Sequence, residues 1–384
     1  MKVVWVTGFL NSHIVELAEQ FNQKHSFKMI VTEDWKMDGA DYGRGAQQKE
    51  YTIPYYKSEN CESCKQLVRE CDFAIFGGGS RELLSIRMET NGLSFLYSER
   101  FFKKGTWRRF IPKTRKAVLD GGVKYKNQHL YPLCASAYLP YDLSLLSFPV
   151  EKCFKWGYFP KTEMELDLDS LMAKKRKNSI LWCARLISLK RVDLAIRVGE
   201  ILAKNNYDFE MNIVGDGPLK ETAEREIQKR NLGEHIHILG TKSLSEVREI
   251  MKSSEIFIFT SNRLEGWGAV LNESMNSACA PIASHAIGSV PFLINENETG
   301  LVFKSGSAKD LYKKVAYLLE QPKEREKIGR QAYNAITKKW NAEVAVARLT
   351  VLAESLLDNG TVSFIDGPCS AANVLKENWY RCNS

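Results

Sequence analysis

The sequence lacks the segments that would place it across a membrane or outside the cell. No apolar run reaches about 18 residues, the shortest length that crosses a bilayer as a helix. The N-terminus enters an apolar strand at once, without the cationic region of a signal peptide. The sequence also has neither internal repeats nor low-complexity segments. We therefore expect a globular cytoplasmic protein.

The sequence also has few of the side-chain patterns that hold a metal ion. Its nine cysteines are an odd number, which is more typical of a reducing compartment than of a disulfide framework. A zinc site is conceivable at Cys61, Cys64 and Cys71. No second cysteine pair and no nearby histidine accompanies them, so we favour free thiols. Asp167 and Asp169 lie in a charged stretch that we interpret as a solvated linker. We predict neither a metal ion nor a cofactor.

What the sequence does contain is an alternation of strand and helix patterns. At 384 residues, 44% of them hydrophobic, the chain is long for one globular domain and suits two. Ser12 is the expected N-cap of a helix at 13–21, whose apolar residues have helical spacing. Short apolar runs predict strands in the first half at 2–7, 27–32, 72–76, 93–97 and 117–119. Such alternation is typical of a parallel α/β sheet.

The second half continues this alternation. A strand at 209–214 lies between helices predicted at 191–204 and 219–229, and Ser243 with Glu246 forms a capping box for the next helix. Four further helices are predicted at 308–320, 323–339, 343–357 and 371–380. We divide the chain into a first domain at 1–160, a linker at 161–177, a second domain at 178–358 and a tail at 359–384, placed to return to the first domain.

Residues 265–273, Glu-Gly-Trp-Gly-Ala-Val-Leu-Asn-Glu, are the most informative stretch. They follow an apolar strand and place Glu265 in a loop, two glycines after it, and Glu273 in a helix. A helix that begins near Ala269 directs its free N–H groups and its positive dipole end above the sheet, where a phosphate can bind. Glu273 is then placed to accept hydrogen bonds from sugar hydroxyls.

Three other strand ends carry complementary groups. Arg185 and Lys190 follow a buried strand that begins at Ile180, and the turn 215–218 ends in a proline suited to the first helical position. A fourth strand runs into a glycine-bearing loop at 282–289. The carboxyl ends of parallel strands share one edge of a sheet, where doubly wound folds bind ligands. Two cations, helix N-termini and two carboxylates at one edge suit a diphosphate attached to a ribose.

These motifs resemble those of the retaining glycosyltransferases of the GT-B fold, glycosyltransferase family 4. The resemblance extends from about residue 178 to residue 340, close to half of the chain. The two glutamates with seven residues between them, the Arg…Lys loop and the Gly-Asp-Gly-Pro turn occur in the family's order and spacing. The resemblance implies two doubly wound, Rossmann-like domains that face a cleft. The first would bind an acceptor and the second a nucleotide-diphosphate sugar.

The resemblance also implies a role for each matching residue. Arg185 and Lys190 would neutralise the donor diphosphate, Glu273 would hold the ribose hydroxyls, and Glu265 would lie near the donor sugar. The residues expected to serve catalysis are Glu265, Arg185, Lys190 and His13. The residues expected to bind the donor are Gly8, Arg185, Lys190, Gly215, Asp216, Glu265, Gly266, Trp267, Gly268, Ala269, Val270, Leu271 and Glu273. Transfer would retain the anomeric configuration and need no metal ion.

Three positions depart from the family pattern. Trp267 stands where the family often has phenylalanine, which is a mild change, and Cys279 stands where it often has glycine. Phe292 stands where it often has glutamate, which alters the polar network expected there. None of the three removes an expected diphosphate contact.

Each site residue also has a simpler explanation. Taken singly, Glu265 and Glu273 are better explained as surface acids, which are common. Lys190 could be the polar start of the helix that follows it, and Asp216 suits turn chemistry better than catalysis. Arg185 is harder to explain in this way, because it ends an apolar strand.

The acceptor side is less distinct. His13 lies at a helix start, where histidine is more often a polar cap than a catalyst. The glycines at 77–79 follow a strand and either admit a ligand closely or form a tight turn. Many family members have a histidine after the next strand, where this chain has residues 96–100 and no role can be carried over. The residues expected on the acceptor or membrane side are Gly78, Glu99, Arg100, Phe102, Trp107 and Arg108.

The net charge of +8 is partly local, because residues 101–116 contain no acid. Their cations and large aromatics are Lys103, Lys104, Arg108, Arg109, Lys113, Arg115, Lys116, Phe101, Phe102, Trp107 and Phe110. Such a segment suits an anionic membrane surface. A solvated basic loop explains it about as well. Nucleic acid ranks lower, because no nucleic-acid-binding motif accompanies the segment.

The sequence therefore predicts a retaining glycosyltransferase of the hexosyltransferase type. Its donor would be a nucleotide-diphosphate sugar, a UDP-sugar in preference to a GDP-sugar. Its acceptor would be a hydroxyl of a glycan or a lipid-linked molecule, in the synthesis of cell-surface polysaccharide or glycolipid at the inner face of the membrane. Two alternatives stay open, a nucleotide-sugar epimerase of the same fold and a non-catalytic nucleotide-sugar-binding protein.

Overall fold

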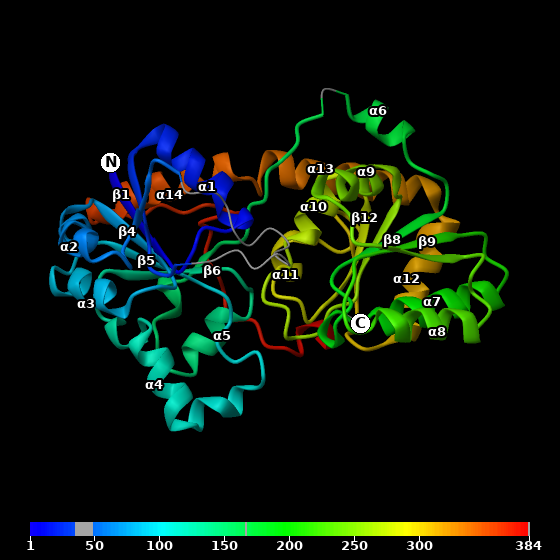
Figure 1. The fold of residues 1–384 in the computed structure, drawn as a ribbon, viewed down its shortest axis with the longest axis horizontal. Coiled ribbons are helices and arrows are strands. Elements are labelled where there is room, and N and C mark those ends of the chain that lie inside the picture. Colours follow the sequence, from blue (N-terminus) through cyan, green and yellow to red (C-terminus); the bar gives the residue numbers. More distant parts are fainter. Residues whose placement is uncertain (35–48, 166, 383–384) are drawn as a thin grey trace. The chain divides into compact units, whose positions relative to one another are not determined.

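The computed structural model describes residues 1–34, 49–165 and 167–382. Their internal contacts divide the chain into two compact units, each with its own parallel sheet (Figure 1). The first unit contains Met1–Lys161 and Trp340–Lys376. The second contains Thr162–Lys339 and Glu377–Ser384. The predicted α/β class with two doubly wound sheets is confirmed.

The first unit is built on a seven-stranded sheet with the order β3-β2-β1-β4-β5-β6-β7. Its strands are β1 (Lys2–Thr7), β2 (Ser26–Val31), β3 (Thr52–Pro54), β4 (Phe73–Gly77), β5 (Ser94–Ser98), β6 (Leu130–Cys134) and β7 (Phe154–Lys155). Its helices are α1 (Ser12–Lys24), α2 (Cys61–Glu70), α3 (Arg81–Glu89), α4 (Pro112–Asp120), α5 (Leu139–Ser144) and α14 (Ala342–Leu357). Its 3₁₀ turns are η1 (Ser58–Asn60), η2 (Thr106–Phe110), η3 (Val123–Tyr125) and η4 (Val150–Lys152). The strand order reverses between β1 and β4, which makes their carboxyl ends a topological switch point.

The second unit is built on a six-stranded sheet with the order β10-β9-β8-β11-β12-β13. Its strands are β8 (Ser179–Cys183), β9 (Glu210–Val214), β10 (Ile236–Gly240), β11 (Ile256–Phe259), β12 (Ala280–Ser284) and β13 (Leu301–Phe303). Its helices and 3₁₀ turns are α6 (Leu168–Ala173), η5 (Ser188–Lys190), α7 (Val192–Lys204), α8 (Lys220–Lys229), α9 (Leu244–Ser253), α10 (Val270–Asn276), α11 (Val290–Leu293), α12 (Ala308–Glu320), α13 (Pro322–Lys338) and η6 (Trp379–Cys382). Here the switch point lies between β8 and β11.

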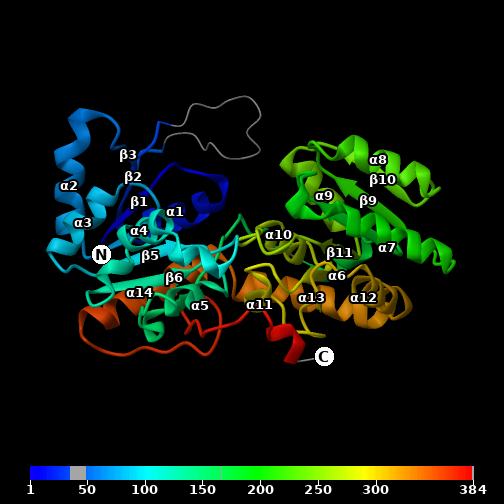
Figure 2. The same ribbon diagram turned by 90° about the horizontal axis from the view of Figure 1, so that it is seen from below.

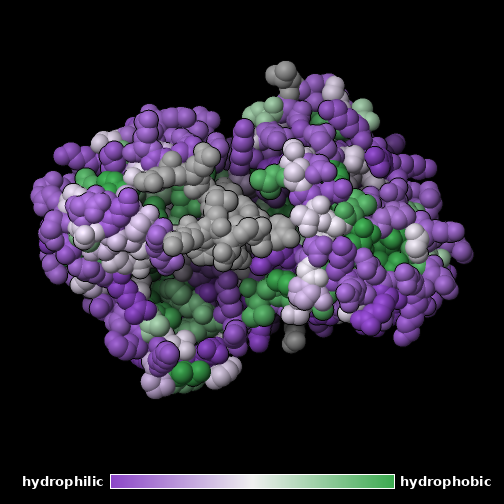
Figure 3. Space-filling model, in the orientation of Figure 1, coloured by the Kyte–Doolittle hydropathy of each residue, from purple (hydrophilic) through white to green (hydrophobic). Residues whose placement is uncertain are grey.

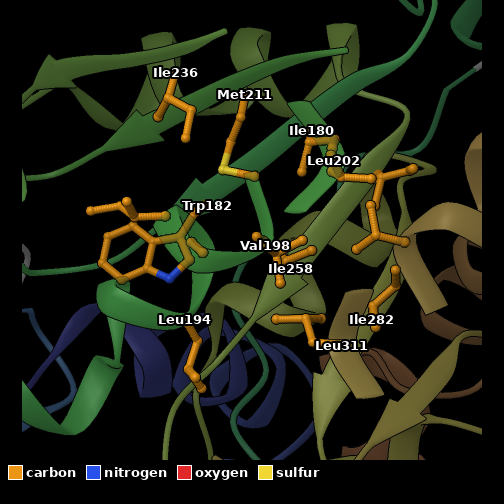
Figure 4. Packing of buried hydrophobic residues seen from close by; sticks show 14 of the residues in the cluster. Ile180, Trp182, Leu194, Val198, Leu202, Met211, Ile236, Ile258, Ile282 and Leu311 are labelled. Atoms are coloured by element: carbon orange, nitrogen blue, oxygen red, sulfur yellow. The ribbon is translucent and has the colours of Figure 1, made fainter. Parts of the chain in front are cut away.

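Both faces of the second sheet are buried, as expected for a parallel sheet. On one face, strand residues such as Ile180, Trp182 and Ile258 pack against α7 and α12, which contribute Val198 and Leu311 (Figure 4). On these strands the neighbouring positions are buried too, so the strands appear in the sequence as continuous apolar runs. Helices therefore flank the sheet on both sides (Figure 2). This packing fixes the strand ends from which the loops described below emerge.

Most long elements match their predictions. The strand at 2–7 and the helix at 308–320 have the predicted bounds, and the capping box between Ser243 and Glu246 is present. The N-cap of α1 is Asn11 rather than Ser12, since the Asn11 side chain accepts from the amide of His13 at 3.0 Å. Pro218 lies two residues before α8 instead of at its first position, because the turn with Gly217 continues through it.

Two predicted elements are wrong. Residues 117–119 lie in α4, which starts at Pro112, because a short apolar run alone does not separate a strand from a helix. The helix predicted at 371–380 does not form. Instead Ala371 pairs with Phe154 in an antiparallel bridge, and the Ala372 amide donates to the Cys153 carbonyl at 2.9 Å. The backbone N–H and C=O groups that a helix would need are thus hydrogen-bonded to the edge of the first sheet.

The domain boundaries also differ from those drawn from the sequence. The stretch 162–177 belongs to the second unit, where it forms α6, and the Lys175 ammonium donates to the carbonyls of Met251, Ser254 and Ser277 at 2.6–3.2 Å. The chain enters the first unit at Trp340 instead of after residue 358, because α14 packs against α1.

The surface shown in Figure 3 is mostly hydrophilic, with hydrophobic residues in small separate groups. The aromatic residues of the basic segment are divided between surface and core. Trp107 and Phe110 on η2 are exposed, whereas Phe102 is fully buried. Among the helices of the described residues, none combines the length and the apolar character needed to cross a membrane.

We expect Gly329→Ala to destabilise the second unit. A methyl group at Gly329 in α13 would lie 2.5 Å from the Ala278 carbonyl oxygen, just beyond α10. Overpacking costs about 1–3 kcal/mol, which exceeds the gain of about 1 kcal/mol in helix propensity. The midpoint of thermal unfolding measures the change. Gly233→Ala is the control, because no heavy atom lies within 4 Å of its added methyl group; equal midpoints for both variants would contradict the packing argument.

Candidate functional site

The loops after β8 and β11 meet at the switch point of the second unit. The Trp182 indole N–H at the end of β8 donates to the Thr260 hydroxyl at 2.8 Å, and that hydroxyl donates to the Lys190 carbonyl at 2.6 Å. The Asn262 amide donates to the Leu189 carbonyl at 2.9 Å. These bonds attach the loop that carries η5 to the loop that follows β11. Two predicted site residues, Lys190 and Glu265, are thereby held together.

Lys190 and Glu265 form an ion pair in which both side chains are mostly buried, 14% and 13% exposed. The same Glu265 oxygen accepts a hydrogen bond from Ser261 at 2.9 Å. The Lys190 ammonium also lies 5.7 Å from the centre of the Phe259 ring, within range of a cation–π interaction. The simpler explanation of Glu265 as an exposed surface acid is therefore wrong, and Lys190, although it stands just before α7, is more than the polar start of that helix. Each fixes the position of the other.

Arg185 is exposed at the same strand end. Its guanidinium has no hydrogen bond or ion pair with any residue that the structure describes. Its neighbour Leu186 is buried, and the Leu186 amide donates to the Asp216 carbonyl at 2.8 Å, which anchors the loop under Arg185. The backbone at Arg185 is thus held in place, while its guanidinium has no partner among the described residues. Such a group suits a phosphate, because guanidinium matches phosphate geometry.

The turn 215–218 brings the β9 end against the β8 end. Gly215 has φ +135°, and a methyl group there would lie 2.0 Å from the Ala184 carbonyl oxygen, so only glycine fits. The Asp216 carboxylate accepts from the Gly217 amide at 2.6 Å and pairs with Lys220 at 3.2 Å. These bonds lower the pKa of Asp216. Asp216 therefore serves the turn, as the sequence favoured.

Glu273 lies in α10, with its side chain one-fifth exposed and its carboxylate 3.8 Å from the Arg248 guanidinium. Burial raises the pKa of Glu273, and the Arg248 charge opposes this only in part. Burial, and to a smaller extent the Glu273 charge, raises the pKa of the Cys183 thiol at the end of β8 to about 12. Glu273 is therefore a sheltered acceptor rather than part of a solvated helix face.

The glycine turn before α10 is tightly packed. Gly268 has φ +84°, and a methyl group there would lie 2.4 Å from the Phe259 ring. Trp267 is buried, its indole donates to the Asn272 side chain at 2.9 Å, and its ring lies 6.3 Å from that of Phe292. Two departures from the family pattern, Trp267 and Phe292, are thus neighbours in space. An aromatic contact stands where a polar network was expected.

The predicted amide contacts are partly occupied. Helix α10 starts at Val270, with Ala269 as an N-cap that has no capping side chain. The Leu271 amide already donates to the Gly268 carbonyl at 3.0 Å. Gly266 is buried beside them. Of the three amides predicted to contact phosphate, that of Leu271 therefore has a partner within the turn.

The predicted residues of the first unit gather around a different cavity, of about 680 Å³. His13, Gly78, Glu99 and Arg108 line it, and Gly8 is not among its lining residues. The Gly8 carbonyl accepts from the Glu33 amide at 2.9 Å. Gly8, expected to bind the donor, and His13, expected to serve catalysis, thus lie on the first unit.

Two residues assigned to the acceptor or membrane side are buried. Arg100 is 1% exposed and pairs with the fully buried Asp142 at 3.1 Å. Phe102 is fully buried, and its amide donates to Asp142 at 2.8 Å. Neither side chain reaches the surface, which corrects a membrane contact for both residues. Arg100 also lines the cavity of the first unit, so its place on the acceptor side stays a prediction. Trp107 does reach the surface, at 58% exposed.

Sequence reasoning missed Arg248 and Ser261. Ser261 lies only four residues before Glu265, so the short sequence separation could have indicated that its hydroxyl donates to the Glu265 carboxylate. Arg248 lies on α9, far from Glu273 in sequence, and no spacing rule connects them. Cys61, Cys64 and Cys71, considered for zinc, lie at α2 and its C-cap. Asp167 and Asp169 are exposed, as expected, but they belong to the second unit and not to a linker: Asp167 caps α6, and Asp169 pairs with Arg330 at 2.6 Å.

The chain is similar to known glycosyltransferases. Residues 164–335 match the family model described as Glycosyl transferases group 1. An uncharacterised glycosyltransferase of Methanocaldococcus jannaschii is 29% identical over 179 residues, 46% of this chain and 48% of that protein. The alpha-D-kanosaminyltransferase of Streptomyces kanamyceticus is 24% identical over 205 residues, 51% of this chain and 53% of that protein. The matched stretches span about half the length of each relative.

Similarity of structure extends over nearly the whole chain. HepE from Anabaena, crystallised in complex with UDP, superimposes with a TM-score of 0.67 at 14% identity, covering 93% of this chain and all of HepE. At that identity the likeness concerns the fold. The expected GT-B fold is confirmed.

We expect Lys190→Met and Glu265→Met each to destabilise the second unit by about 3 kcal/mol, because each leaves a mostly buried charge without its partner. The double variant removes both charges and should cost less than the sum of the two. We expect a coupling energy of about 1–3 kcal/mol. Denaturant unfolding of the four proteins measures it. Additive single effects would show that the ion pair contributes nothing to joining the two loops.

Proposed function

Residues 164–335 belong to the glycosyl transferases group 1 family, and on that premise we propose that this protein is a retaining glycosyltransferase. It transfers a hexose from a UDP-sugar to a hydroxyl of a glycan or a lipid-linked acceptor. The product is a cell-surface polysaccharide or glycolipid, made at the inner face of the membrane. The observation that carries this proposal is the placement of Arg185, Lys190, Glu265 and Glu273 at one switch point.

The cations of this site serve the donor diphosphate. Arg185 has no acidic partner among the described residues and is placed to meet one phosphate. Lys190 is held by Glu265 and offers its remaining donor positions to the other. The charge that develops on the leaving diphosphate is stabilised by groups already in position, which is the most effective form of electrostatic catalysis. Fixed cations thus take the part that a metal ion plays in other transferases.

Glu273 serves the ribose. An ionised carboxylate accepts hydrogen bonds only, so it suits two neighbouring hydroxyls. In the free protein its nearest cation is Arg248 at 3.8 Å, longer than a hydrogen bond, and burial raises its pKa. Nucleotide hydroxyls satisfy a carboxylate whose solvation is otherwise incomplete. The choice of UDP is supported by HepE, which binds UDP on the same fold.

Transfer with retention requires no protein nucleophile in this proposal. The leaving diphosphate assists the acceptor hydroxyl on the face from which it departs, and Glu265 keeps Lys190 on that diphosphate. Incubation with UDP-glucose and a panel of glycan acceptors tests this reaction, with the anomeric configuration of the product read by NMR. An inverted product would contradict it. Conversion of the UDP-sugar without a glycosidic bond would identify an epimerase, and binding without turnover a non-catalytic protein.

We expect Glu273→Gln to weaken UDP binding at least tenfold, because hydrogen bonds to a charged acceptor contribute about 1.5–3 kcal/mol. Calorimetric titration with UDP, GDP and ADP measures the affinities. Glu234→Gln, at an exposed loop glutamate of the same unit, is the matched control and should bind as the wild type does. Equal affinity of all three proteins for every nucleotide would remove Glu273 from the site.

We expect the same substitution to stabilise the ligand-free protein at neutral pH. Burial raises the pKa of Glu273, so the folded state holds the proton more tightly than the unfolded chain. The ionised group therefore costs stability as pH rises from the ordinary carboxyl range through the folded pKa, and the full cost remains above it. UDP affinity should fall as pH is lowered through that same range. Thermal unfolding from pH 4 to pH 8 checks the first point; lower stability of Glu273→Gln at pH 8 would contradict it.

A further inference from the structure

The cavity of the first unit lies at that unit's topological switch point. Its walls include Thr7 from the end of β1 and Gly77 from the end of β4, the two strands between which the order reverses. Open α/β sheets bind ligands at this place. A methyl group at Gly78, which has φ +99°, would meet no atom within 4 Å, so the cavity is open at the backbone. With about 680 Å³, it has room for a sugar with an attached group.

The cations of the basic segment fall into two sets. Lys103, Lys104 and Arg108 line the cavity. The remaining cations of 101–116 are not among its lining residues, and Lys113 and Arg115 are exposed on α4. The segment 101–116 was predicted to form one basic surface, but some of its cations line the cavity and others lie on the outer surface of α4. Three of its cations, the exposed Lys104 and the partly buried Lys103 and Arg108, contribute to one wall of the cavity.

The charges on this wall do not cancel. Lys103 pairs with Glu99, the cavity's carboxylate, and the lining residue Arg100 is neutralised by Asp142. Lys104 and Arg108 have no carboxylate within 4 Å in the part of the chain that the structure describes. A concave site lined by positive charges concentrates the electrostatic field and attracts an anion. Guanidinium with a nearby ammonium is a donor set that phosphate groups favour.

Another wall is aromatic and polar. The rings of His13 and Tyr158 stack with centroids 5.3 Å apart and planes 9° apart. The Tyr158 hydroxyl donates to Glu99 at 2.7 Å, so the stack is fixed to the same carboxylate that holds Lys103. Stacked rings beside a carboxylate are suited to a sugar ring, which offers apolar C–H groups and hydroxyl donors. The cavity therefore combines a place for a sugar with a place for an anion.

We propose that this cavity binds the phosphate or diphosphate of a glycosyl acceptor through Lys104 and Arg108, with the acceptor sugar against His13 and Tyr158. The role of this ligand as an acceptor rests on the proposed function, whereas the binding of a glycosyl phosphate does not. The shared chemistry is a phosphate ester, which a soluble glycosyl phosphate or a lipid headgroup can supply. We expect the cavity to favour the glycosyl phosphate, since these cations and the stacked rings line the same cavity.

The test compares two double variants that each remove two cations from the same segment. Lys104→Gln with Arg108→Gln alters the cavity, and Lys113→Gln with Arg115→Gln alters exposed positions of α4. The probe is glucose 1-phosphate, titrated against the full-length chain by NMR with UDP present at saturation, so that the second unit is occupied. Methyl glucoside is the uncharged comparison. We expect the cavity variant to bind glucose 1-phosphate at least tenfold more weakly and the exposed variant to change less than twofold.

Three outcomes would overturn the proposal. They are no saturable binding to the wild type, equal losses in the two double variants, and equal affinity for the phosphate and the methyl glucoside. A second arm measures binding to phosphatidylglycerol vesicles against phosphatidylcholine vesicles. If the cavity variant loses vesicle binding while glucose 1-phosphate binding is unchanged, the two cations serve a lipid headgroup and the proposal fails. UDP titrated alone reports separately on the proposed function, because it requires neither the cavity nor an acceptor.

Discussion

The ion pair between Lys190 and Glu265 is the interaction on which the second unit's site depends. It joins two loops that leave adjacent strands of the sheet, and backbone and side-chain bonds through Thr260 and Asn262 support it. Because both side chains are mostly buried, the pair is stable only with its geometry intact. A lysine held in this way has little rotamer entropy left to lose when a phosphate arrives. The proposed catalysis is thus a consequence of how the two loops are attached.

The two units place charge at the same position of the same architecture. In each, the sheet order reverses once and the loops from the two central strands carry the ionisable groups. Each site also contains cations without a carboxylate partner among the described residues, Arg185 in the second unit and Lys104 with Arg108 in the first. Solvated surface cations are ordinary, but cations at a concave strand edge create a field that favours an anion. Both proposed sites therefore rest on one principle, positive charge at a topological switch point.

The sequence predicted elements whose signal is local. The long helices of the second unit and strands such as β1 carry their periodicity within a few turns, and the glutamate pair is a contiguous motif. The sequence did not predict what depends on distant partners. Residues 369–372 pair with the edge of the first sheet, and the supposed linker is packed by Lys175 and capped by Asp167. Intrinsic helix and strand propensities do not predict such contacts, because tertiary hydrogen bonds override them.

The same limit applied to the site. Its ionisable residues were identified from their strand-end positions, whereas the state of each was set by neighbours that spacing does not reveal. Arg248 beside Glu273 and Phe292 beside Trp267 are examples. A crystal structure of the protein with UDP would show whether the switch point of the second unit is the donor site. We expect the diphosphate within about 3 Å of Arg185 and Lys190, and the ribose hydroxyls within hydrogen-bond distance of Glu273. UDP bound instead beside Lys104 and Arg108, or bound without contact to Glu273, would contradict this assignment.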